Sequence, residues 1–500
     1  MDGTRSKPIQ VGRNVDRGLW ALEDSTWKAG FLLVVAILAV VSYLPLAVAL
    51  LCVLLFDWAS KHELAIPLVI LLIPVRQVSL GTIGEAQVRV GDVVLAAVGL
   101  IWLARKATER PGPSRPSTSL EVIAVLFVLL NVLSVVWAED KAFAILRAGK
   151  LLRNYALFFL IVDYLARGFD KNLQRLGTAM VLAGWAVLGG FAYSFWTQGG
   201  LAAFRALLTV QELGSQGPEL VFLRLDQGAT IFFADIANWT MMTVFLAAGL
   251  LPRLQNRRPA FRRMVTYYTI AGTCAVFLSL TRGAIVALVV GMLFLGPPVL
   301  KTLGRRHRAL ILVGLAVAIG LVAIGFARVI AVHFASIPTD LSQLQRLDLW
   351  SRAVEAFMSA PWLGVGAGNV ILDTYIAVHN LFLQVLGELG LLGAAVFSGL
   401  LFCWLGALIR LARQPSQLPK NFVLVRSVLA ASVAYLVYSL VSAEAMEGME
   451  PWILLGVTTA LVHENQPSAA ALTVHKLSGL AAARSVQKTR VPEQIVPENT

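Results

Sequence analysis

Apolar runs long enough to cross a lipid bilayer constrain this chain more than any other feature of its sequence. A bilayer core about 30 Å thick needs about 20 apolar residues per helix. The clearest runs lie at about 90–104, 119–137, 147–165, 174–196, 230–251, 265–280, 283–300, 309–330, 379–409, 421–442 and 452–464. They lack the period-two alternation of transmembrane strands. The sequence therefore predicts an all-α fold: a polytopic integral membrane protein with about 12–14 transmembrane helices and a long extracytoplasmic loop.

Composition supports the membrane class. Of the 500 residues, 57% are hydrophobic and 14% are charged, whereas a soluble globular protein carries about 25% charged residues. The three cysteines, Cys52, Cys274 and Cys403, all lie in apolar runs and lack the spacing of a disulfide framework or a zinc site. We therefore expect them to be small core residues.

The two ends of the chain differ from its apolar middle. Residues 1–29 form a basic, polar arm without a signal peptide, and residues 465–500 have the composition of a disordered tail. The transmembrane domain is expected to span 30–464. Within it, residues 30–56 contain Pro45 and predict either two short helices or one kinked helix, and 64–75 is a short apolar run.

The distribution of Lys and Arg predicts the orientation of the chain. Alternate polar segments (1–28, 105–118, 166–175, 252–264, 301–308, 410–426 and 463–500) hold 29 of these residues. The opposite set (138–146, 197–229, 281–282, 331–378 and 443–451) holds 6. By the positive-inside rule the first set, with the N-terminal arm and the C-terminal tail, is cytoplasmic. The loops 197–229 and 331–378 are then external, and orientation explains the net charge of +13 better than nucleic-acid binding does.

The longest polar interruption, 331–378, leads directly into the apolar run 379–409. That run has 31 residues, or about 46 Å of straight helix against a bilayer core of about 30 Å. Its first turns should therefore stand above the hydrocarbon, with His379 at the aqueous mouth. A histidine there is either a functional group or a helix-entrance residue bonded to a loop carbonyl.

Several motifs in this part of the chain resemble one family. They are His379-Asn380 followed by Gly390 and Gly393, Arg346-Leu-Asp-Leu-Trp350, the run from Pro361 to Asn369, Leu278-Ser-Leu-Thr-Arg282-Gly-Ala, and, more loosely, Arg224 with Asn238. Together they cover about 220–393 and resemble the superfamily of O-antigen ligases and O-antigen polymerases. Thr281 stands where serine is usual.

The resemblance implies an enzyme and its substrates. It implies a metal-independent glycosyltransferase of the bacterial cytoplasmic (inner) membrane, with its active site facing the periplasm. The donor would be a polyprenyl-pyrophosphate-linked glycan, and the acceptor a lipid or a second glycan. Neither a cofactor nor a nucleic acid is implied.

The chemistry of such a transfer points to particular side chains. The acceptor hydroxyl must lose a proton, and histidine accepts protons near neutral pH, so His379 is the candidate base. Pyrophosphate is held by a metal or by arginine, and no Asp-x-Asp pair occurs in the external segments. Arg282, in the shortest external turn, is therefore the candidate pyrophosphate ligand, with an interfacial anchor as the alternative.

Further residues are candidates for substrate binding. Arg224 and Arg346 are weaker candidates, because each is equally consistent with a surface residue or with a pair to Asp226 or Asp348. Asn380 is included because it follows His379 in the motif. Arg147, Lys150 and Arg153 recur every three residues at the external end of a helix, where either an anionic ligand or snorkelling at the interface explains them.

Other polar features have competing explanations. Gly364, Gly366 and Gly368 fit a phosphate-binding loop of backbone N–H groups or a plain turn. Gly387, Gly390 and Gly393 fit close helix packing. Arg352 and Glu355 are spaced to form a pair, and Glu388 is a secondary site candidate.

Three activities remain open at this stage. The His-Asn…Gly…Gly pattern favours a ligase, which moves a finished glycan to a lipid acceptor. A polymerase of O-antigen or exopolysaccharide repeats is the nearest alternative. A flippase of the same lipid-linked glycan is the alternative from another class, although it predicts charges deep within several helices rather than at their external ends.

Overall fold

A computed structural model describes most of the chain between residues 63 and 465. The described residues are 63–73, 79–83, 86–89, scattered positions in 95–106, 117–197, 236–254, 259–278, 282–302, scattered positions in 305–320, 341–370, 378–414, 421–441 and 448–465. The predictions for the N-terminal arm, for residues 30–56, for the loop 198–229 with Arg224, and for the tail 466–500 lie outside these residues.

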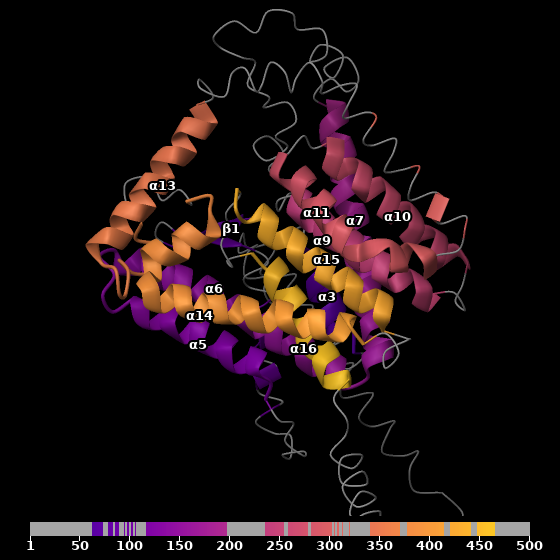
Figure 1. The fold of residues 1–500 in the computed structure, drawn as a ribbon, viewed down its shortest axis with the longest axis horizontal. Helices are drawn as coiled ribbons and strands as arrows, with labels where there is room; N and C mark the ends of the chain where they lie inside the picture. The colour runs from indigo at the N-terminus through magenta and orange to yellow at the C-terminus, as the bar shows by residue number, and fades with distance from the viewer. Residues whose placement is uncertain are drawn as a thin grey trace, which may run out of the picture.

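The described chain is helical (Figure 1). The helices are α3 (Ala65–Leu72), α5 (Ser119–Ser134), α6 (Lys141–Ala166), α7 (Phe169–Thr197), α9 (Ile236–Leu250), α10 (Pro259–Leu278), α11 (Arg282–Thr302), α13 (Leu341–Ser359), α14 (Leu381–Ala412), α15 (Phe422–Tyr438) and α16 (Glu450–Glu464). A short 3-10 helix, η3 (Leu251–Leu254), extends α9. Most of the apolar runs in this part of the chain thus correspond to helices.

One element was not predicted. Strands β1 (Ser79–Ile83) and β2 (Ala86–Arg89) form an antiparallel hairpin in which Ile83 pairs with Ala86. The sequence signal for it is present, because β-branched residues flank a two-residue loop that begins with glycine.

Two described helices are long and apolar enough to cross a membrane, namely residues 169–193 of α7 and 381–412 of α14. Shorter apolar helices are Ser119–Ser134, Gly283–Gly296 and Phe422–Tyr438. This agrees with the membrane class. The number of spans and the external position of 331–378 stay predictions.

Helix starts follow local capping signals. Thr118 caps α5, because its hydroxyl accepts from the Glu121 backbone N–H while the Glu121 carboxylate accepts from the Thr118 N–H. This reciprocal arrangement satisfies two donors that a helix start leaves unpaired. Asp140 caps α6 in the simpler way, accepting from the Phe143 N–H at 2.9 Å.

Helix α15 lies at the centre of the bundle, against α9, α11 and α14 (Figure 1). Small residues allow the close approach. A methyl group added at Gly249 would lie 2.8 Å from the Ser427 Cβ, and one at Gly291 would lie 2.9 Å from the Ala430 carbonyl oxygen. Small residues at helix contacts are typical of membrane bundles, where backbone proximity replaces the hydrophobic effect.

Contacts at one end of the bundle join segments that the Lys/Arg pattern assigns to the cytoplasm. Arg253 contacts Asp170 at 2.7 Å and also Asn421, and its guanidinium lies 5.7 Å from the centre of the Phe169 ring. His463 lies 3.3 Å from the Glu121 carboxylate.

Contacts at the opposite end join segments of the other set or the helix turns next to them. The Leu381 N–H donates to the Ser439 carbonyl at 3.0 Å, and Asn154 donates to the Gly448 carbonyl at 3.0 Å. Asp140 contacts Asn369, at 2.6 Å from backbone nitrogen to side-chain oxygen. The helix connections therefore agree with the alternation on which the topology prediction depends.

Candidate functional site

Helix α14, which begins just after His379, is broken at Gly390. Gly390 has φ 61° and ψ −159°, which is not helical, and the ribbon changes direction there (Figure 1). The prediction of one straight helix over 379–409 is therefore wrong. Residues 381–389 form a separate half-helix, and the longer apolar part, from Leu391 to Ala412, is the part that we expect to span the bilayer.

The loop from Pro361 to Gly366 fills the break. Leu391 N–H donates to the Pro361 carbonyl at 2.8 Å, and Leu392 N–H donates to the Trp362 carbonyl at 3.2 Å. In return, Val365 N–H donates to Gly387 O at 3.0 Å and Gly366 N–H donates to Glu388 O at 2.9 Å. The loop thus satisfies the four backbone groups that the break removes from the helix, as buried backbone N–H and C=O groups require.

The glycine-rich turn is built for close packing. Gly364, Gly366 and Gly368 have φ of 67°, 97° and 79°, in the left-handed region that favours glycine. A methyl group at Gly364 would lie 2.3 Å from the Glu388 backbone, and one at Gly366 would lie 2.7 Å from the Ala138 Cβ. These glycines therefore let the turn lie directly against the backbone of its neighbours.

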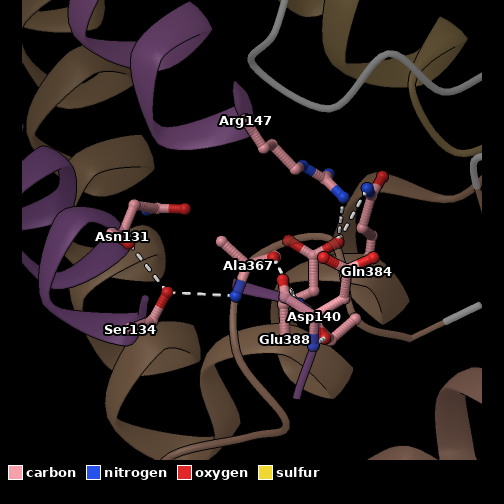
Figure 2. A network of polar contacts seen from close by, with 8 residues as sticks. Asn131, Ser134, Asp140, Arg147, Ala367, Gln384 and Glu388 are labelled. Atoms are coloured by element: carbon pink, nitrogen blue, oxygen red, sulfur yellow. Dashed lines mark hydrogen bonds and ion pairs between the residues drawn. The ribbon is translucent and has the colours of Figure 1, made fainter. Parts of the chain in front are cut away.

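The backbone donors of this turn are already engaged by the protein. Beside the N–H groups of Val365 and Gly366, that of Ala367 donates to the Ser134 hydroxyl at 3.0 Å (Figure 2). The phosphate-binding interpretation of the turn is therefore wrong, and the plain-turn interpretation is right for these three donors. The glycine spacing alone does not distinguish a phosphate-binding loop from a plain turn, because both need glycine.

Asn369 fixes the other end of the turn. Its side-chain oxygen accepts from the Asp140 N–H, and its amide nitrogen donates to the Ala367 carbonyl at 2.9 Å. Asn369 is buried. Its hydrogen bond with Asp140 ties the turn to the start of α6. Asn369 ends the motif that begins at Pro361, and no role was predicted for it.

A buried ion pair joins α6 to the half-helix of α14. Arg147 contacts the Glu388 carboxylate, and their side chains are 13% and 5% exposed. Gln384 donates its amide to the same carboxylate at 2.9 Å, and Figure 2 shows the three side chains converging. Glu388 was a secondary candidate from sequence, and its contact with Arg147 was not predicted.

The other two basic residues of α6 lie in different surroundings. Lys150 is exposed, whereas Arg153 is half-buried and donates to the Asn154 side chain at 3.1 Å. The three residues of this basic repeat therefore differ in burial, and their role in binding an anion stays a prediction. A spacing of three residues drifts around the helix, which agrees with the difference in burial between Arg147, Lys150 and Arg153.

His379 stands immediately before the half-helix in an uncommon backbone conformation. Its φ is 55°, which few non-glycine residues adopt, although histidine is among those enriched there. Asn380 follows as the N-cap, accepting from the N–H groups of Phe382 at 3.0 Å and Leu383 at 3.1 Å. The left-handed turn and the cap hold His379 half-exposed at the entrance of α14.

Arg282 begins α11 near the same place. Its side chain lies outside the described residues, but its neighbour Gly283 is placed closely: an added methyl group would lie 2.5 Å from Val441. Since Leu381 bonds to Ser439, the starts of α11 and α14 both contact the end of α15. The backbones that carry Arg282 and His379 are thus brought to one end of one helix.

Arg346 and Arg352 both lie on α13. Arg346 is half-buried. The Asp348 carboxylate accepts from Arg352 at 2.9 Å, one turn away, whereas the i,i+3 spacing predicts Glu355 as its partner. An i,i+4 pair is equally favourable on a helix surface, so sequence spacing alone does not choose between the two carboxylates.

Comparison with known families gives one match. Residues 267–398 match the model described as O-antigen ligase. The match contains Arg282, Arg346, His379 and Asn380, and begins after Arg224. No curated protein matches the chain. The match over residues 267–398 supports membership of the O-antigen ligase superfamily for this part of the chain.

Proposed function

We propose that this protein is an outer-face glycosyltransferase of the ligase type, moving a glycan from a polyprenyl-pyrophosphate donor to an acceptor hydroxyl. The observation that carries the proposal is that the starts of α11 and α14, which both lie inside the matched region, converge on the end of α15. The family match supports a membrane enzyme that acts on lipid-linked glycans. The convergence of the two helix starts supports a shared site for His379 and Arg282.

In the proposed reaction, His379 accepts the proton of the acceptor hydroxyl. The hydroxyl oxygen attacks the anomeric carbon of the donor glycan, and the bond from that carbon to the pyrophosphate oxygen breaks. The positive charge of Arg282 stabilises the negative charge on the departing pyrophosphate, which stays attached to its polyprenyl chain. No metal is needed in this scheme, because the guanidinium supplies a fixed, two-pronged cation.

The backbone around His379 supports its role as the base. A side chain that must accept a proton at one position benefits from a conformation held before the substrate binds. The left-handed φ of His379, the Asn380 cap and the bond from Leu381 to Ser439 provide three local restraints. Strained backbone of this kind tends to occur at functional sites.

The remaining site assignments are part of the proposal. Residues proposed to contact the donor are Asn380, Arg346, Arg224, Lys150 and Arg153. For Arg147 the contact with Glu388 favours an indirect role, in which Arg147 holds the half-helix that begins beside His379. The proposed topology places both termini in the cytoplasm and this site on the periplasmic side of the inner membrane.

Ligase activity is tested by reconstituting the purified full chain in liposomes with a lipid-linked glycan and an acceptor lipid. A new glycosidic bond to the acceptor lipid is the expected product. Glycan joined to glycan would support the polymerase alternative. Movement of the donor between leaflets without any new glycosidic bond would contradict the enzyme proposal and support a flippase.

A further inference from the structure

Helix α13 carries an apolar face that the described fold leaves exposed. Leu347, Val354 and Met358 are 57%, 44% and 69% exposed. Their spacings of seven and four residues place them on one side of the helix. Large apolar side chains gathered on a face mark a contact with something apolar.

This exposed face is distinct from the face that packs in the core. Leu349 and Ala353, on the other side of α13, are buried with Val378. The Ala353 carbonyl oxygen would lie 3.0 Å from a methyl group added at Gly387, so the core face lies directly against the half-helix of α14. The exposed apolar face therefore points away from α14.

A third face of α13 is charged. Asp348 and Glu355 are exposed, and Arg352 pairs with Asp348. The helix thus presents a core face, an exposed apolar face and a charged face in sequence around its axis. A helix with adjacent apolar and charged surfaces is suited to lie at a boundary between oil and water.

Exposed apolar residues also follow α13, up to the longer part of α14. Trp362 is 73% exposed just after α13, and its carbonyl accepts from the Leu392 N–H at 3.2 Å. Leu391 and Leu392 are themselves exposed at the first turn of the spanning part. Backbone hydrogen bonds therefore hold Trp362 at the level where the apolar span begins, and tryptophan is enriched at that level of a bilayer.

We propose that α13 lies in the headgroup–acyl boundary of the bilayer, with Leu347, Val354, Met358 and Trp362 in contact with lipid. The occupant of the apolar face is the membrane itself, because exposed apolar side chains follow from Met358 through Trp362 to Leu391 and Leu392 of α14. A second copy of the chain is the competing occupant. It is less well supported, because among the described side chains of α13 the exposed apolar ones are confined to this narrow face.

The position of α13 has a consequence for the active site. Since α13 packs on the half-helix that begins beside His379, its depth also sets the depth of His379. A pyrophosphate attached to a membrane lipid lies at headgroup level, so the catalytic group and the donor would meet at one depth. This consequence rests on the proposed function, whereas the lipid contact of α13 does not.

Spin labels on α13 test the lipid contact separately from activity. The full chain, with Cys52, Cys274 and Cys403 replaced by alanine, is labelled at Met358→Cys or, as the matched control on the charged face, at Glu355→Cys. In nanodiscs, the label at 358 should be accessible to oxygen and shielded from a water-soluble nickel complex. The label at 355 should show the reverse.

Two outcomes would overturn the proposal. Equal access of the nickel complex to both labels would place the apolar face in water. Spin–spin broadening at 358 that disappears on dilution with unlabelled protein would show a second copy on this face.

Should the labelled variants fail to fold, quenching by brominated lipids is measured on the wild-type chain and on Trp362→Phe. A larger quenched fraction in the wild type is expected, and equal fractions would contradict the lipid contact.

Discussion

The ion pair between Arg147 and Glu388 makes a quantitative prediction about stability. In the Arg147→Met variant the long stem remains while the Glu388 carboxylate loses its arginine. Breaking one partner of a buried pair typically costs about 3–5 kcal/mol, whereas exposed pairs contribute about 0–1 kcal/mol. Because the two side chains are only 13% and 5% exposed, the buried magnitude applies, and we expect a loss of at least about 3 kcal/mol.

A double-mutant cycle separates the pair from the packing of each side chain. Glu388→Gln removes the carboxylate charge at nearly constant shape, and Arg147→Met with Glu388→Gln removes both charges. The double variant should be less destabilised than the sum of the singles, with a coupling of about 2–4 kcal/mol. Neutral hydrogen bonds within membranes couple by about 0.6 kcal/mol on average, so the two kinds of interaction are distinguishable.

The assay is reversible unfolding of the purified protein in mixed micelles as the fraction of denaturing detergent rises. Lys150→Met is the matched control, because Lys150 is exposed on the same helix, and it should change the free energy of unfolding by less than about 0.5 kcal/mol. A loss below about 1 kcal/mol in Arg147→Met without coupling would show that the pair behaves like a solvated one. The structural argument for its role would then be refuted.

Three further predictions follow from other parts of the chain. Gly366→Ala should destabilise the fold by about 2–4 kcal/mol, because φ is 97° and the added methyl would lie 2.7 Å from Ala138; Gly149→Ala, with nothing within 4 Å, should not destabilise it. The pKa of Glu63 is held below its usual value of 4.5, first by the hydrogen bond from Lys171. The stability that the Glu63 carboxylate contributes is therefore fully present above pH 4.5 and is lost as the pH falls through the lower, folded-state pKa of Glu63. Glu63→Gln should cost about 1 kcal/mol or less at neutral pH and nothing once the pH is well below the folded-state pKa, and a cost that persists there would contradict the assignment. Glycan transfer should continue in excess chelator, and a complete loss that magnesium or manganese restores would contradict the arginine-based scheme.

The positions of the helices follow from sequence because apolar length and capping residues are local signals. Thr118 and Glu121 mark the start of α5 without reference to any other segment. Asn380 before an apolar run is the same kind of signal, and it indicates the start of α14 one residue after His379. The family motifs likewise lie within the chain segment that holds both Arg282 and His379.

The break in α14 is not predictable in this way. Gly390 in an apolar helix is consistent with simple packing, and only the inserted loop, which bonds to both sides of the break, explains its φ of 61°. The partner of Arg147 is equally hidden, because Glu388 approaches it only through tertiary packing. Charges distant in the chain carry no sequence signal for each other.

The most direct test of the central claim is single-turnover transfer by two variants of His379. His379→Asn keeps a residue that tolerates the left-handed backbone but cannot act as the base, and His379→Ala removes the side chain. Both should bind the lipid donor nearly as well as the wild type does and should lose about 10²–10⁴-fold in transfer rate. Arg352→Ala, on the surface of α13, is the control and should retain its rate. Near wild-type transfer by well-folded His379→Asn would show that His379 only shapes the entrance of α14, and would contradict its assignment as the base.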